Sequence, residues 1–154
     1  MARALVAVGA ALLLALIALG VAVHLTHDDE GVAVDNLLAE DISRAVGTAE
    51  AGGSGVVDLG RVAPFEWDEL LIAERTATDG EISHAIGHEF NGDRGVGAGD
   101  LMIFLRDGKV ARFADYRGEG NFEGIDRPVA RFDRDEAVFT VRSLVIRPRG
   151  SPRG

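Results

Sequence analysis

The chain has 154 residues, enough for one compact domain with its own hydrophobic core, and it contains no cysteine. The lack of cysteine excludes disulfide bonds, thiolate metal sites and a cysteine nucleophile. The formal net charge is −9, and the stretch 28–136 holds all 25 acidic residues but only 11 of the 16 basic ones, which leaves that stretch at −14. Because affinity for nucleic acid comes mainly from neutralising phosphates, we expect no nucleic-acid partner.

Residues 4–23 contain no charged or strongly polar side chain. A bilayer core about 30 Å thick is crossed by about 20 helical residues, so this segment is long enough to span a membrane. Arg3 precedes it and acids from Asp28 onward follow it, so the positive-inside rule keeps the N-terminus in the cytoplasm and exports the rest. The alternative is a cleaved signal peptide, whose apolar region is usually shorter, about 7–15 residues. We expect residues 1–27 to be the signal anchor or signal peptide of a single-pass membrane protein with an extracytoplasmic domain.

Residues 28–55 are predicted to form a helical stalk and a glycine-rich linker. Asp35 is a typical helix N-cap, and an apolar stripe continues from it to about Val46. The sequence Ala-Gly-Gly-Ser-Gly at 51–55 is typical of a flexible linker. The stripe has two possible uses: it pairs with another helix, or it packs on the domain.

The folded domain is predicted to cover residues 56–146 and to have an α+β fold, with a small, mostly antiparallel sheet and one or two short helices. Thr78 and Glu81 have the spacing of a capping box, which begins a helix that ends at Gly87. Two earlier segments have the composition of strands: 56–62 and 68–73.

The clearest element is a β-hairpin over residues 101–114. Its turn is Asp107-Gly108, because both central positions of a type I′ turn need positive φ. A two-residue turn predicts five cross-strand pairs: Leu105 with Val110, Phe104 with Ala111, Ile103 with Arg112, Met102 with Phe113 and Leu101 with Ala114. Since 101–105 is apolar on both faces, we expect an inner strand that a helix covers on at least one side. A last strand is expected over 137–146, followed by a disordered basic tail at 147–154.

Three segments of the domain form a pattern when they are taken in chain order. They are Phe65-Glu66-Trp67-Asp68 before an apolar strand, the hairpin Leu101–Val110, and Phe132 followed by Asp135-Glu136-Ala137-Val138-Phe139. Together they resemble a family of small exported or membrane-anchored bacterial proteins of unknown function. The resemblance covers about residues 60–141 and departs in the glycine-rich loop 90–99. It implies bacterial origin, export and this fold, and it supplies no catalytic residue.

His84 and His88 are four residues apart and share a helix face with Glu81. Two imidazoles and a carboxylate are typical zinc ligands. Two observations weaken the metal hypothesis. Gly87 is predicted to end the helix between the histidines, and the zinc-protease motif places a glutamate directly after its first histidine, where this chain has Ala85. The alternative is an exposed polar helix face.

No nucleophile motif is present, since Gly-x-Ser-x-Gly is missing and the only lysine, Lys109, cannot complete Ser-x-x-Lys. The favoured function is a non-enzymatic interaction module that faces the cell envelope and binds an envelope protein. Its acidic surface favours a basic partner or a cationic ligand. The alternative is a metal-binding protein or metal-dependent enzyme that holds zinc with His84, His88 and Glu81. A third hypothesis is self-association through the anchor and the helix at 35–46.

Overall fold

The computed structural model describes residues 33–52, 55–92, 99–125 and 127–153. None of the helices in these ranges is both long and apolar enough to cross a membrane. The predicted anchor, residues 4–23, lies outside the described residues. The described part has the predicted α+β class, with two mostly antiparallel sheets where one was predicted.

The first sheet has the strand order β4-β3-β2-β6, and every neighbouring pair is antiparallel. Its strands are β2 (Glu69–Ala73), β3 (Asp100–Arg106), β4 (Lys109–Tyr116) and β6 (Val129–Asp133). The side chains at 70–73 and 101–105 are buried whichever way they point. The inner strands β2 and β3 therefore lack the polar alternation of a half-exposed sheet, because both of their faces are covered.

The second sheet has the order β1-β7-β8-β5. Its strands are β1 (Val56–Asp58), β5 (Asn121–Phe122), β7 (Val138–Arg142) and β8 (Val145–Pro148). Only β5 and β8 pair in parallel. Here the side chains alternate: Phe139 and Val141 are buried, whereas Thr140 and Arg142 are exposed. One face of this sheet therefore belongs to the core and the other points to solvent.

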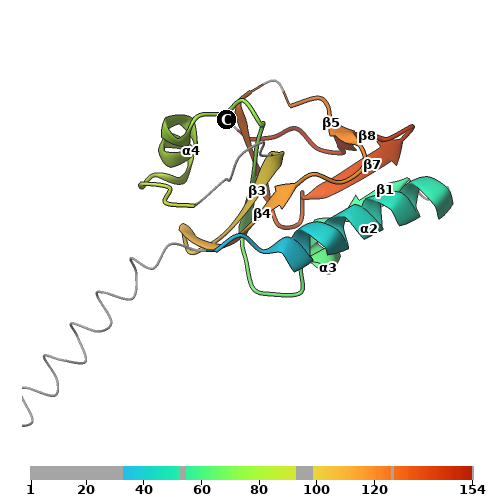
Figure 1. The fold of residues 1–154 in the computed structure, drawn as a ribbon, viewed down its shortest axis with the longest axis horizontal. Helices are drawn as coiled ribbons and strands as arrows, with labels where there is room; N and C mark the ends of the chain where they lie inside the picture. The colour runs from blue at the N-terminus through green and yellow to red at the C-terminus, as the bar shows by residue number, and fades with distance from the viewer. Residues whose placement is uncertain (1–32, 53–54, 93–98, 126, 154) are drawn as a thin grey trace, which may run out of the picture. The chain divides into compact units, whose positions relative to one another are not determined.

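The helices of the described part are α2 (Asn36–Gly52), α3 (Leu59–Val62) and α4 (Asp79–Ile86). α4 covers one face of the first sheet, where Ile82 and Ile86 are buried. α2 and the second sheet cover the other face, where Phe104 of β3 and Phe139 of β7 belong to one core. Figure 1 shows α4 and α2 on opposite sides of β3 and β4. The prediction that 101–105 is an inner strand covered by a helix is confirmed.

α2 is part of the domain core, which corrects the predicted stalk. Leu38, Ile42 and Val46 are at most 4% exposed, and the helix contacts β1, β4 and β7. The Oδ1 atom of Asp35 accepts a hydrogen bond from the N–H of Leu38 at 3.0 Å, so the predicted N-cap is confirmed. The apolar stripe extends to Ala49, and this is why the helix continues past its predicted end. The apolar stripe was predicted either to pair with another helix or to pack on the domain, and the structure shows that it packs on the domain.

Gly55 connects α2 to β1 in a fixed position at the end of the predicted linker. Its N–H donates to the carbonyl of Ala49 at 3.2 Å, and its own carbonyl accepts from the N–H of Val141 at 2.7 Å. Its φ is +56°, and a Cβ atom would lie 2.9 Å from the carbonyl oxygen of Val141. Glycine is therefore required here both for its backbone conformation and for the close approach to β7.

The β3–β4 hairpin has the predicted turn but a different register beyond it. Asp107 and Gly108 have φ values of 51° and 75°. The first predicted pair is present, and a β-bulge then shifts the pairing by one residue. Ile103 pairs with Phe113, where Arg112 was predicted. Because a one-residue shift moves every side chain to the opposite face, the bulge places the Phe113 ring in the buried layer under α4.

The predicted strand 137–146 is a hairpin of β7 and β8. Ser143 and Leu144 form its turn, with φ values of 52° and 59°. Hairpin turns with positive φ at both positions are usually built from Asn, Asp and Gly. Serine and leucine carry no such signal, and the turn was therefore not predicted.

The predicted disordered tail, residues 147–154, is attached to the domain up to Arg153. β8 continues to Pro148, and the N–H of Arg153 donates to the carbonyl of Arg131 in β6 at 2.9 Å. The Arg153 guanidinium also pairs with the carboxylates of Asp133 and Glu136. Backbone pairing and charge pairing together hold the segment on the acidic surface.

Candidate functional site

The predicted metal ligands lie on α4 and just beyond its end. Gly87 adopts the left-handed conformation, with φ of 82°, and ends the helix between His84 and His88 as predicted. Both histidines and Glu81 are exposed. The Glu81 carboxylate accepts hydrogen bonds from the N–H and the hydroxyl of Thr78, each at 2.8 Å, within the predicted capping box.

Glu81 is the only carboxylate among the three predicted zinc ligands, and it already accepts hydrogen bonds within the capping box. Hydrogen bonds from Thr78, first from its N–H and then from its hydroxyl, hold the pKa of Glu81 below its ordinary value. In the ranges that the structure describes, no group of three or more His, Asp or Glu side chains could hold a metal ion. Zinc binding by Glu81, His84 and His88 stays a prediction, which zinc titration of the full-length protein and of H84A would test.

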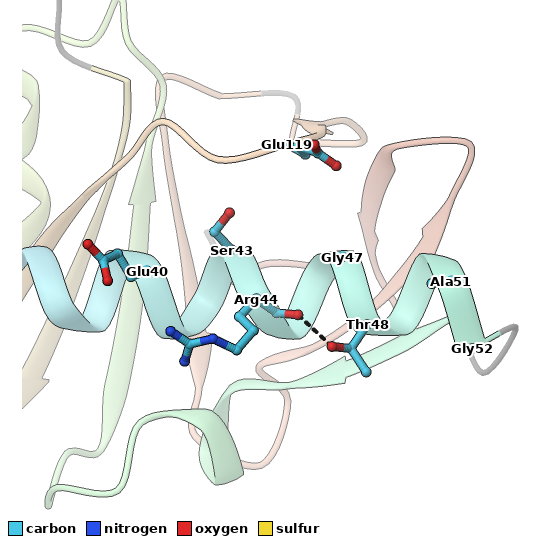
Figure 2. A pocket seen from close by; sticks show the side chains of 8 residues that line it. All are labelled: Glu40, Ser43, Arg44, Gly47, Thr48, Ala51, Gly52 and Glu119. Atoms are coloured by element: carbon cyan, nitrogen blue, oxygen red, sulfur yellow. Dashed lines mark hydrogen bonds between the residues drawn. The ribbon is translucent and has the colours of Figure 1, made fainter.

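A shallow hollow of about 810 Å³ lies along the solvent side of α2 and reaches Glu119 (Figure 2). Figure 2 shows Ser43 pointing toward the Glu119 segment, whereas the Arg44 side chain points to the other side of the helix. The Thr48 hydroxyl donates to the carbonyl of Arg44 at 2.8 Å, so it is used within the helix. Because these polar groups do not converge on one point, the hollow lacks the geometry of a ligand site.

A second groove, of about 440 Å³, lies on the solvent face of the second sheet, beside the C-terminal end of α2. We call it the arginine groove, because Arg142 of β7 and Arg147 and Arg149 at the end of β8 line it. Val56 and Val145 lie among these arginines and give the groove an apolar component. β1, β7 and β8 form the right-hand part of the view in Figure 1.

The strand register brings the three arginines to one face. Thr140 and Arg147 stand directly opposite each other on β7 and β8. Arg142 lies two residues further along β7. Arg149 lies one residue past the end of β8 in the opposite direction, where its N–H still donates to the carbonyl of Val138 in β7 at 3.0 Å. Residues two apart on a strand share a face, so all four side chains point to solvent. Strands advance about 3.3 Å per residue and lie about 4.8 Å apart, which puts the Cα atoms of Arg142 and Arg149 roughly 14 Å from each other.

Two of these arginines have no counter-charge among the described residues. Arg147 forms an ion pair with Glu123 at 2.5 Å. Between residues the structure describes, no hydrogen bond or ion pair involves the exposed side chains of Arg142 and Arg149. Most other arginines of the described part pair with a carboxylate: Arg44, Arg61, Arg106, Arg112, Arg117, Arg131 and Arg153. Arg75 is also exposed without a side-chain partner among the described residues, but Arg142 and Arg149 differ from it because they share one groove with Arg147. This grouping makes the groove a candidate site for an anionic ligand.

Glu50 lines the same groove, and its carboxylate is engaged with backbone donors. The N–H groups of Ser143 and Leu144 donate to its two carboxylate oxygens at 3.0 and 3.4 Å. These bonds hold the β7–β8 turn against the end of α2 and satisfy turn amides that the hairpin itself leaves open. Glu50 therefore shapes one end of the groove by fixing the position of the turn.

The sequence places these arginines after its last acidic residue, but sequence analysis gave no reason to bring them together. After Glu136 the only charged residues are arginines, and 147–154 was predicted as a tail. Without the turn at 143–144, Arg147 and Arg149 could not be placed on the same face as Arg142. The signal that was available is the period of two in the arginine positions 147 and 149, which is typical of a strand with one solvent face.

Comparison with known proteins gives no relative: no protein-family model, no curated protein and no solved structure matches the chain. The resemblance to small exported bacterial proteins therefore stays a prediction, and the arginine groove has to be judged by its own geometry.

Proposed function

We propose that the protein is a non-enzymatic interaction module, held at the outer surface of a bacterial membrane by residues 4–23, which binds a protein of the cell envelope. The observation that carries the proposal is the arginine groove, an exposed sheet face on an otherwise acidic domain, where Arg142 and Arg149 have no carboxylate partner in the part of the chain that the structure describes. A surface charge opposite to that of the surrounding domain selects a partner by electrostatic complementarity.

The composition of this face supports a protein partner. Val56 is 39% exposed on β1, and Leu144 is 41% exposed in the β7–β8 turn. Exposed apolar side chains next to arginine are typical of protein interfaces, because arginine combines charge with a long apolar stem and planar donors. The apolar side chains supply area to bury, and the arginines supply orientation.

Two of the groups with shifted pKa values have structural roles, and these roles support the non-enzymatic part of the proposal. Burial raises the pKa of Tyr116 to about 12, and its hydroxyl donates to the carbonyl of Glu119. Burial also acts to raise the pKa of Asp35, but hydrogen bonds from the N–H of Leu38 and from Arg112 outweigh it and the net shift is downward. Catalytic groups are usually perturbed within a cleft, whereas these two hold α2 and the end of β4 in place.

The anchor and the exported position rest on residues 4–23 and on the asymmetry of flanking charge. The membrane position is tested by fractionation and by adding protease to spheroplasts. We expect the full-length protein in the membrane fraction, with its domain cut from outside. A protein found only in the soluble fraction, or protected from the protease, would contradict this part of the proposal.

The interaction itself is tested by cross-linking in cells. The full-length protein carries an affinity tag at its N-terminus, and recovered complexes are identified by mass spectrometry. The matched control is a fusion of residues 1–32 to an unrelated soluble domain. We expect one envelope protein, recovered reproducibly and in near-stoichiometric yield, that is missing from the control. Recovery of the same proteins in both samples would show that the domain binds no specific partner. Enzymatic turnover of a substrate by the purified protein would contradict the non-enzymatic part of the proposal.

A further inference from the structure

We propose that the arginine groove takes an extended acidic segment of the partner protein, with two carboxylates that pair with Arg142 and Arg149. This inference rests on the proposed function and names the chemistry of the partner. The groove is thus a specific binding site, and the rest of the acidic surface is not part of it.

The first step is the spacing of the unpaired charges. Arg142 lies on β7 and Arg149 directly follows β8, with the Thr140–Arg147 pair between them. Their Cα atoms are roughly 14 Å apart by strand geometry, and an extended chain covers about that distance in four residues. Two acidic side chains four residues apart on an extended segment also point to the same side. The spacing of the arginines therefore matches an acid at position i and another at i+4.

The second step is the surface between the two arginines. Val56 and Val145 line the groove. The hydroxyl of Thr140 donates a hydrogen bond to the carbonyl of Arg147 at 3.3 Å. Small apolar or β-branched side chains of the segment, placed between its acids, would bury these valines. Apolar contact around a charged pair excludes water and strengthens the pair.

The third step distinguishes a narrow segment from a membrane surface. The stretch 28–136 carries −14, so a planar layer of anionic lipid would meet the acidic surface of the domain together with the groove. A single extended segment contacts only the groove. It gains the attraction of Arg142 and Arg149, whereas the carboxylate of Glu50, which also lines the groove, accepts hydrogen bonds from the amides of Ser143 and Leu144.

The test measures binding of a fluorescent peptide to the full-length protein in detergent. The peptide is Glu-Val-Thr-Val-Glu with blocked ends, and its counterpart carries glutamine in place of both glutamates. We expect saturable binding of the acidic peptide, at least tenfold weaker binding of the glutamine peptide, and weakening of the acidic complex by salt. Equal binding of the two peptides would overturn the proposal.

Variants locate the binding on the protein. R142Q/R149Q should weaken binding at least tenfold. R75Q should change it less than twofold, because Arg75 is an exposed arginine without a side-chain partner in the described residues, outside the groove. R142K/R149K keeps the charge and should retain part of the affinity, which separates a charge effect from misfolding. A loss per removed charge in R75Q as large as that in R142Q/R149Q would show an unspecific response to net charge and would overturn the groove as the site.

Two further outcomes would also decide against the proposal. Tighter binding to phosphatidylglycerol vesicles than to the peptide, lost in R142Q/R149Q, would assign the groove to lipid. An envelope protein that is still recovered by cross-linking with R142Q/R149Q would leave the proposed function standing and remove the groove as its site. The inference and the proposed function can therefore fail separately.

Discussion

At the scale of single residues, Glu50 shows how one carboxylate fixes the shape of the groove. It accepts hydrogen bonds from two turn amides whose residues both have positive φ, Ser143 and Leu144. Positive φ costs a leucine conformational energy, so the turn needs contacts that hold it. Because these contacts come from α2, the helix and the hairpin are joined at the groove.

We predict that Glu50→Ala lowers the free energy of unfolding by about 1 kcal/mol, because two backbone donors lose a charged acceptor but stay accessible to water. The control is Glu40→Ala on the same helix, whose exposed side chain has no partner in the described part. Urea denaturation followed by circular dichroism measures both. Equal effects of the two substitutions would mean that helix propensity, and not the turn, explains the change.

Arg134 is a second residue with a structural role, and this role depends on its planar guanidinium group. Its guanidinium donates to the carbonyls of Phe65, Trp67 and Gly60 at 3.0 to 3.2 Å, and it stacks 4.9 Å from the centre of the Trp67 ring. A planar guanidinium can make all of these contacts at once, whereas an ammonium group cannot. Arg134 therefore connects α3 with the segment that leads into β2.

We predict that Arg134→Lys costs about 2 kcal/mol of stability, since it removes planar donors and the stacking contact. Arg61→Lys is the matched control, because the Arg61 side chain is 88% exposed and forms only a surface ion pair with Asp58. Thermal unfolding should show a clear drop for the first variant and almost none for the second. An Arg134→Lys protein as stable as the wild type would contradict the role given to the guanidinium.

At the scale of elements, the position of α2 decides where the domain begins. Leu38, Ile42 and Val46 are in the core that both sheets share, so a domain cut at residue 56 would lose one wall of that core. We predict that Ile42→Ala, at a side chain 1% exposed, costs about 3 kcal/mol, within the usual range for such a cavity. A freely exposed stalk would tolerate the change.

The control for α2 is Leu37→Ala one position away, because Leu37 is 74% exposed. Its effect should stay below about 0.5 kcal/mol, as for most surface substitutions. Chemical denaturation of the two variants therefore measures directly whether the helix packs on the domain. Equally small losses of stability in Ile42→Ala and Leu37→Ala would contradict the packing of α2 on the domain and would support an exposed stalk.

The capping box of α4 predicts a pH dependence. Hydrogen bonds from the N–H of Thr78, and then from its hydroxyl, lower the pKa of Glu81 below 4.5. A lowered pKa means that the ionised group stabilises the folded state above the unfolded pKa, and that this stabilisation is lost as the pH falls through the folded value. The difference in melting temperature between wild type and Glu81→Gln should be constant at neutral pH and should close as the pH falls below 4.5. A gap that persists at low pH would show that the carboxylate charge plays no part.

The elements that sequence reasoning predicted correctly are those with strong local signals. The capping box, the Gly87 stop, the Asp107-Gly108 turn and the apolar strand at 101–105 each depend on residues close together in the chain. The features it missed depend on contacts made across the fold. The bulge that places Phe113 under α4, and the Ser143–Leu144 turn held by Glu50, follow from packing against distant elements. The candidate site was missed for the same reason.

At the scale of the whole molecule, the distribution of charge organises the surface. The acids end at Glu136, and the next three arginines lie on β7, on β8 and one residue past β8. Arg153 folds back onto Asp133 and Glu136, and Arg147 pairs with Glu123. Within the ranges that the structure describes, no carboxylate pairs with Arg142 or Arg149, and these are the two arginines that we propose a partner binds. The central claim is therefore that the protein contacts its partner through this one face.

The most direct measurement is site-specific photo-cross-linking in living cells, with a photoreactive residue at Thr140 in the arginine groove or at Thr76 in the exposed segment after β2. We expect one discrete cross-linked band from position 140 and none from position 76, and we expect R142Q/R149Q to remove the band. The same band from both positions, or a band from position 140 that survives R142Q/R149Q, would contradict the central claim.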